Sequence, residues 1–120
     1  MYQSEQLKER TKQFAIRIVC LFRILPKNEE SRVIGRQLLR SGTSVAANYR
    51  AVCRSRSKAE FIAKIGVVVE EPDESAFWLE LLIDTGIIAQ EKIKELLRES
   101  NELLAIFAAS QSTAKKGLTH

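Results

Sequence analysis

The sequence predicts an all-α protein, an antiparallel up-down-up-down four-helix bundle, and three observations support this. Apolar residues recur at helical spacing in four long segments that are separated by short connectors. The chain contains only five Gly and two Pro, too few for the many tight turns of an all-β fold. Its 120 residues have the length of one domain, so residues 1–120 are treated as a single bundle.

The first two helices are predicted at residues 4–25 and 29–54. Ser4 is the predicted N-cap of the first helix, and Pro26 ends it because proline cannot continue a helix. Asn28 is the predicted N-cap of the second helix and precedes two glutamates, which the helix dipole favours there. The predicted core residues are Leu7, Phe14, Ile18, Leu21 and Leu25 in the first helix, and Ile34, Leu38, Val45, Tyr49 and Val52 in the second.

The third and fourth helices are predicted at residues 57–86 and 89–112. Ser57 and Glu60 have the spacing of a capping box, and Gly86 is typical of a helix end. The predicted core residues are Phe61, Ile65, Val68, Leu79 and Leu82 in the third helix, and Ile93, Leu96 or Leu97, Leu104 and Phe107 in the fourth. The polar stretch that follows, from Ser112 to Gly117, predicts a frayed end.

Pro72 lies within the third predicted helix. Proline lacks a backbone N–H and clashes with the preceding turn, so a kink at Pro72 is expected. A break of the chain into five shorter helices is the alternative.

The segment RQLLRSGTSVAANYR, residues 36–50, has the weak helix formers Gly42, Thr43 and Ser44 at its centre. At about 100° per residue, however, the apolar side chains keep one continuous phase across this centre, which favours a helix over a loop. Gly42 lies beside the core stripe, where the absence of a side chain allows close approach of a neighbouring helix. Packing must then offset a propensity cost of about 1 kcal/mol relative to Ala.

The same projection places five arginines on one stripe opposite the core, within about 40° of its centre. Like charges four residues apart repel, so we expect an anionic partner for this stripe. That partner is either the acidic cluster around Glu70 to Glu74 of another subunit or a nucleic-acid phosphate backbone, and a solvated surface is the remaining interpretation. The candidate nucleic-acid-binding residues are Arg32, Arg36, Arg40, Arg50 and Arg54.

The charge is divided unevenly along the chain. Residues 1–58 contain 13 Lys and Arg against 4 Asp and Glu, a net charge of +9, whereas residues 59–120 contain 6 against 11, a net charge of −5. The two halves either attract each other within the bundle or form a basic face for RNA or DNA. The few aromatic residues are not interleaved with the arginines, so any binding would be through phosphates and weakly sequence-specific.

The blocks RQLLRSGTSVAANYR, RSKAEFIAKIG and EEPDESAFWLELL together resemble the bacterial four-helix bundle family named for the 23S rRNA intervening sequence. The resemblance covers about residues 8–107. It implies an antiparallel four-helix bundle, a ring-shaped homopentamer and no established enzymatic activity. The accessory protein of diversity-generating retroelements is a more distant similarity, also a pentameric bundle, and it binds nucleic acid.

The matching residues fall into three blocks: Arg40, Ser41, Ser44, Asn48 and Tyr49; Ser57, Glu60 and Phe61; and Glu71, Asp73, Glu74, Trp78 and Leu79. Two positions depart from the family pattern. The family usually has Glu at the position of Ala51 and a residue other than proline at the position of Pro72. The first departure makes the second helix more basic, and the second puts a straight third helix in doubt.

Polar residues on the second and third helices predict an interhelical hydrogen-bond network that fixes their register, and a functional pocket is the alternative. The network residues are Ser44, Asn48, Glu71 and Glu74. Three aromatic residues, Tyr49, Phe77 and Trp78, are expected in the core or in a subunit interface rather than in a base-stacking platform.

No constellation for catalysis or for a metal is found, so we expect no enzymatic activity, no cofactor and no metal. The only histidine is His120, and the Glu-x-x-His ligands of di-iron bundles and phosphate-binding loops are absent. Cys20 and Cys53 lie in apolar runs and are expected to be buried free thiols. Without a signal peptide or a membrane-spanning run, the expected compartment is the cytoplasm.

Several apolar residues lie outside the predicted core, namely Ile16, Val19, Val33 and Ile106. A second apolar stripe on a bundle of this size predicts an interface, so the chain itself is an expected partner. The expected function is that of a homo-oligomeric, non-enzymatic bundle that binds nucleic acid, with RNA favoured. The alternative is a protein–protein scaffold whose arginines make salt bridges between subunits.

Overall fold

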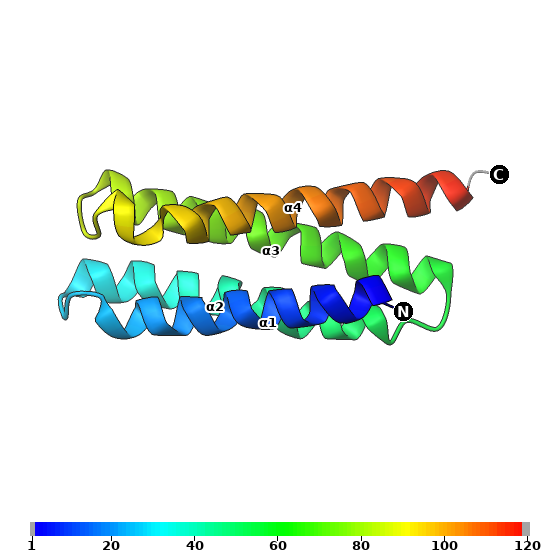
Figure 1. The fold of residues 1–120 in the computed structure, drawn as a ribbon, viewed down its shortest axis with the longest axis horizontal. Coiled ribbons are helices and arrows are strands. Elements are labelled where there is room, and N and C mark those ends of the chain that lie inside the picture. The colour runs from blue at the N-terminus through cyan, green and yellow to red at the C-terminus, as the bar shows by residue number, and fades with distance from the viewer. Residues whose placement is uncertain (1, 119–120) are drawn as a thin grey trace.

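The computed structural model describes residues 2–118, and in this range all regular secondary structure is helical. The helices are α1 (Tyr2–Ile24), α2 (Glu29–Cys53), α3 (Lys58–Asp84) and α4 (Gln90–Leu118). Successive helices are joined at alternate ends of an elongated molecule (Figure 1), whose extents are 51 × 22 × 21 Å. The predicted all-α class is confirmed. None of the described helices is long and apolar enough to cross a membrane.

The helices pack in chain order around one core. α2 contacts both α1 and α3, and α3 contacts α4, whereas the contact between α1 and α4 is less extensive. All four helices contribute to the core, whose largest fully buried apolar side chains are Phe14, Phe107, Ile18, Leu38, Ile65, Leu79, Leu82, Ile93 and Leu103. In α4 the fully buried residue is Leu103, not the predicted Leu104, because spacings of three and four residues from Leu96 lead through Ser100 to Leu103 and Phe107.

The predicted caps hold α2 and α3 at their ends. The Asn28 side chain accepts a hydrogen bond from the Ser31 N–H at 2.9 Å. The Ser57 hydroxyl accepts from the Glu60 N–H at 3.1 Å, which confirms the start of α3. Gly86 has a φ of 76° in the left-handed region, where glycine carries no steric penalty, and it follows the last turn of α3.

Two helix boundaries differ from the prediction. α1 begins at Tyr2, so Ser4 lies inside the helix and is not its N-cap. α4 continues to Leu118, so the predicted end near residue 112 is wrong. No glycine or proline interrupts the last turns before Gly117, and Lys115 and Lys116 stabilise the negative end of the helix dipole.

Pro72 does not break the third helix. α3 runs without interruption from Lys58 to Asp84, so the alternative of five shorter helices is wrong, while the kink at Pro72 stays a prediction. The Pro72 side chain is buried, and its carbonyl oxygen accepts a hydrogen bond from the Ser100 hydroxyl of α4 at 2.7 Å. This contact ties the middle of α3 to α4.

The two cysteines are free thiols, as expected, but both are exposed, so their predicted burial is wrong. Cys20 follows the buried Ile18 by two residues, which turns it to the outer side of α1. An apolar sequence neighbourhood therefore gave the wrong environment for the cysteines.

α1 and α2 approach each other closely at two glycines of α2. A methyl group at Gly42 would lie only 2.7 Å from Cγ1 of Ile18, and one at Gly35 would lie 2.8 Å from Cδ1 of Leu25. Ile18 and Leu25 are themselves buried in the core, so they have little room to move. The expected close approach at Gly42 is confirmed.

We expect Gly42→Ala to lower the free energy of unfolding by up to about 2 kcal/mol. The overpacking cost of about 1–3 kcal/mol exceeds the gain in helix propensity of about 1 kcal/mol. Gly66→Ala is the matched control, because a methyl group there meets only the end of the Gln111 side chain, at 3.2 Å. The control should be more stable by up to about 1 kcal/mol. Urea unfolding followed by circular dichroism measures both variants, and equal stabilities would contradict the close-packing argument.

Candidate nucleic-acid interface

Four of the five candidate arginines lie free on the surface of α2. Arg32, Arg36, Arg50 and Arg54 are exposed, and none of them forms an ion pair within residues 2–118. They extend over most of the length of α2, because Arg32 lies in its first turns and Arg54 is its C-cap. Their charge is therefore available to an external anion.

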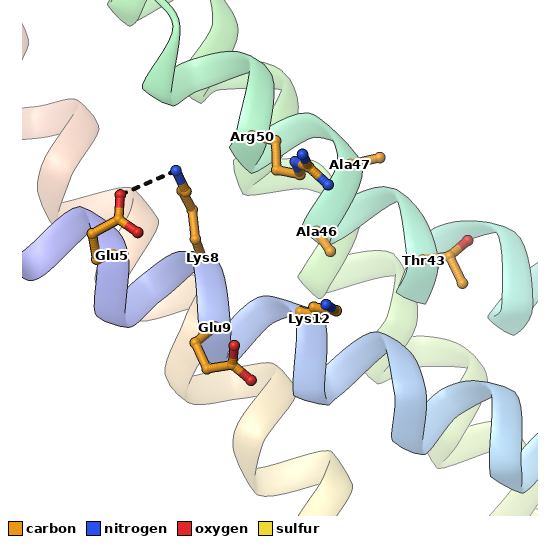
Figure 2. A pocket seen from close by; sticks show the side chains of 8 residues that line it. All are labelled: Glu5, Lys8, Glu9, Lys12, Thr43, Ala46, Ala47 and Arg50. Carbon is orange, nitrogen blue, oxygen red and sulfur yellow. Dashed lines mark ion pairs between the residues drawn. The ribbon is translucent and has the colours of Figure 1, made fainter.

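Arg50 borders an open hollow of about 500 Å³ between α1 and α2 (Figure 2). On the α2 side the wall is formed by small residues, Thr43, Ala46 and Ala47. α1 contributes two glutamates and two lysines, listed together as Glu5, Lys8, Glu9 and Lys12. The α2 wall therefore has short side chains, and the charges of the hollow come from α1 and from Arg50.

The charges of α1 in this hollow are partly paired. Lys8 contacts Glu5 at 3.1 Å, and the Glu9 carboxylate accepts a hydrogen bond from the Gln13 amide at 2.8 Å. Lys12 is exposed and has no ion-pair partner among the described residues. Lys12 and Arg50 are therefore the two unpaired cations on opposite walls of the hollow.

Arg40 is placed differently from the other four arginines, because it faces α3. Its guanidinium forms an ion pair with Glu74 and lies 3.8 Å from the Glu71 carboxylate. The Trp78 indole N–H donates a hydrogen bond to the same Glu74 carboxylate at 3.0 Å. The acidic residues of α3 thus neutralise an arginine of their own chain, as attraction between the two halves of the chain within the bundle would do, and not an arginine of another subunit.

Of the four predicted network residues, only Glu74 makes a hydrogen bond between α2 and α3 among the described residues, and its partner there is Arg40. Ser44 and Asn48 are half-buried, but neither side chain makes a hydrogen bond within the described part of the chain. The buried Ser75 hydroxyl instead donates to the Ser41 hydroxyl at 2.9 Å, and Ser41 donates to the Leu38 carbonyl at 3.3 Å. Short serine side chains fit the closely packed contact between α2 and α3. A serine at a position of the apolar stripe of each helix is the sequence feature that could have predicted this contact.

Sequence reasoning missed the ion pair between α1 and α4. The Arg10 guanidinium donates two hydrogen bonds to Glu99, at 2.7 and 2.8 Å, and contacts Glu102 at 2.6 Å. These hydrogen bonds raise the pKa of Arg10 above its usual range, so the guanidinium stays charged. Opposite charges on neighbouring helices were visible in the sequence, but the register that joins them was not.

The three aromatic candidates have different environments. Tyr49 is buried and stacks on Phe107 with ring centroids 5.3 Å apart, and burial raises the pKa of its hydroxyl. Trp78 is half-buried against the core. Phe77 is 53% exposed and meets Trp78 edge to face, so it is not a core residue, and its place in a subunit interface stays a prediction. Its place on α3, away from the arginine stripe, gives no base-stacking platform beside the free cations.

Residues 2–118 contain no group of three or more His, Cys, Asp or Glu that could hold a metal ion. His120, the only histidine of the chain, lies outside the described residues.

Residues 4–109 match the model of a protein family described as the 23S rRNA-intervening sequence protein. The chain belongs to this family. A crystal structure from Bacteroides thetaiotaomicron, described as a protein of unknown function from the S23 ribosomal protein family, is similar to this intervening-sequence protein. The TM-score is 0.83 at 34% sequence identity, over 91% of this chain and 97% of that chain. No match was found among curated proteins. Neither description names an enzymatic activity.

Glu71 is the carboxylate with the least favourable environment near Arg40. Its side chain is 14% exposed, and its buried Oε2 atom has no hydrogen-bond partner. Burial raises the pKa of Glu71, the Arg40 charge acts in the opposite direction, and the nearby Glu74 and Glu70 raise the pKa further. The folded chain therefore holds the Glu71 proton more tightly than the unfolded chain.

We expect Glu71→Gln to raise the free energy of unfolding at pH 7. Because the folded-state pKa lies above the unfolded value, ionised Glu71 costs stability at neutral pH. That cost disappears as the pH falls through the raised pKa and below the unfolded value of about 4.3. The gain of the variant should therefore be present at pH 7 and absent at low pH in urea titrations. Glu80→Gln, at an exposed position of α3, is the control and should show no such gain. If Glu71→Gln instead lowers the stability at pH 7, attraction to Arg40 outweighs burial.

Proposed function

We propose that this intervening-sequence protein is a non-enzymatic, homo-oligomeric bundle that binds nucleic acid, RNA in preference to DNA, through the phosphate backbone. The observation that carries the proposal is a row of exposed cations without ion-pair partners on α1 and α2. We define the α1–α2 face by these residues: Lys12, Arg32, Arg36, Arg50 and Arg54. The preference for RNA rests on the family description alone.

The physical argument starts from repulsion within the α1–α2 face. Arg32 and Arg36, and likewise Arg50 and Arg54, are four residues apart on one helix, where like charges repel. Phosphates relieve this repulsion, and the guanidinium fork matches their geometry. Phe77, the strongly exposed aromatic ring of the described residues, lies on α3, and only the half-buried Phe22 ring lies beside these cations. Most contacts would therefore position a nucleic acid through its phosphates without reading its bases.

A double variant, Arg36→Ala with Arg50→Ala, tests the α1–α2 face. Each lost phosphate contact should reduce the slope of log affinity against log salt by about 0.7–0.9, so the double variant should lose about 1.4–1.8 of the wild-type slope. Fluorescence anisotropy of a labelled RNA oligonucleotide between about 50 and 200 mM salt gives these slopes.

The matched control for this titration is Arg98→Ala. Arg98 is an exposed arginine of α4 that is paired with Glu95 at 3.1 Å, outside the α1–α2 face. Its removal should leave the slope unchanged. No binding by the wild-type protein at the lowest salt would overturn the proposed function.

The second candidate function is that of a scaffold, which the acidic and apolar surface of α3 favours. Phe77 is exposed there together with Glu70, Asp73 and Glu80. The α1–α2 face of one subunit would meet this surface on the next, and such a head-to-tail contact closes into a ring where the rotation allows. Ile16 and Val33 are exposed as expected, whereas Val19 and Ile106 are half-buried. Ile24 and Val67 are exposed as well, so the apolar part of this interface would include residues that the sequence did not indicate. The proposed number of five subunits rests on the family resemblance alone.

Charge reversal separates the two functions. Under the proposed function, Arg36→Glu combined with Arg54→Glu should abolish RNA binding and leave a homo-oligomer, whereas in a scaffold it should dissociate the subunits. Light scattering measures the mass, and a wild-type mass near the 13.6 kDa of one chain would contradict any oligomer. Loss of assembly in the variant without any RNA binding by the wild type would favour the scaffold.

A further inference from the structure

A second, smaller hollow of about 290 Å³ lies where α1 turns into α2. One wall is apolar and is formed by Phe22, Leu25 and Pro26. The Phe22 ring is half-buried and packs against Gly35, where an added methyl group would lie 3.1 Å from it. The ring is therefore held in place and presents a flat apolar surface.

The same hollow is also lined by cations. They are Lys27, Arg32 and Arg36, all three are exposed, and none forms an ion pair within residues 2–118. The Lys27 ammonium donates a hydrogen bond to the Arg23 carbonyl at 3.3 Å. The positive end of the α2 dipole lies at the same place. Glu29 and Glu30 belong to the first turn of α2, but they do not line the hollow.

Ser31 is an independent sign of a missing ligand. It also lines the hollow, it is 0% exposed, and its hydroxyl has no hydrogen-bond partner in the structure. Its backbone N–H is already satisfied by the Asn28 side chain. Buried hydroxyls are normally hydrogen-bonded, so an unpartnered one beside three cations that have no ion-pair partner indicates a site that an acceptor completes.

From these groups we infer that the hollow binds a phosphate monoester that carries a flat group, with the phosphate on the cations and the flat group on Phe22. A volume of about 290 Å³ lies just below the roughly 300–1,000 Å³ of small-molecule sites, so the hollow has room for one nucleotide at most. The ligand comes either from free mononucleotides or from the 5′-phosphate end of an RNA. For the second source the inference rests on the proposed function.

The first test uses adenosine monophosphate, followed by the amide NMR signals of Ser31 and Arg32. Saturable shifts are expected, with adenosine and inorganic phosphate each binding at least about tenfold more weakly, because each lacks one half of the recognised groups. Arg36→Ala should weaken binding about tenfold. Arg54→Ala, at the far end of α2, is the control and should not. No shift at these amides, or phosphate binding as tightly as the nucleotide, would overturn the inference.

Ser31→Ala separates a ligand role from a structural one. The variant should bind adenosine monophosphate several-fold more weakly without losing stability, because it removes a hydroxyl that has no partner in the folded chain. Lower stability with unchanged nucleotide binding would show that the hydroxyl serves the fold and would contradict its role in the site.

The second test compares two RNAs of identical sequence, one with a 5′-phosphate and one with a 5′-hydroxyl. Tighter binding of the phosphorylated RNA, with the difference removed by Ser31→Ala, identifies the RNA end as the ligand. Equal binding of the two RNAs alongside nucleotide binding identifies free mononucleotides and leaves the proposed function intact. Failure of both RNAs to bind overturns the proposed function, while the nucleotide titration still tests the hollow.

Discussion

The close approach of α1 and α2 at Gly35 and Gly42 is the constraint on which the rest of the molecule depends. These glycines are seven residues apart, two helical turns, so both face α1. They let the buried side chains of Ile18 in α1 and of Leu25 directly after α1 pack on the α2 backbone. Such a contact fixes the register of the two helices, since a shift along the axis would drive Ile18 against side chains instead of a gap. The register in turn places Lys12 across the groove from Arg50, and Phe22 beside Arg36.

The other helix pairs are held in register by polar contacts of limited number. Ser75 and Ser41 join α3 to α2, and Ser100 joins α4 to the Pro72 carbonyl, all within buried surroundings. Arg10 joins α1 to α4 through its hydrogen bond to Glu99. Of the helix pairs in contact, α1 and α4 have the least extensive contact. Because each buried polar group must find its partner, these contacts discriminate between alternative registers that an apolar core alone would accept.

The same architecture separates the arginines of α2 into two classes. Arg40 points to α3 and is neutralised by Glu74 and Glu71, whereas the arginines turned toward α1 or outward meet no carboxylate. The attraction between the basic and acidic halves of the chain is therefore satisfied at only a few positions. The remaining positive charge, together with the two hollows between α1 and α2, supports an anionic partner for this face.

The sequence by itself determined the four helices, most of the core and the role of Gly42, because apolar periodicity and caps such as Asn28 act within one helix and need no knowledge of its neighbours. It also placed the arginines on one stripe. Only the tertiary structure decided which polar groups pair, because pairing depends on helix register. Arg40 pairs with Glu74 and Arg10 with Glu99. The Ser44 hydroxyl has no partner among the described residues, and Ser41 takes part in the contact between α2 and α3 instead. The hollow beside Ser31 likewise exists only where two helices meet.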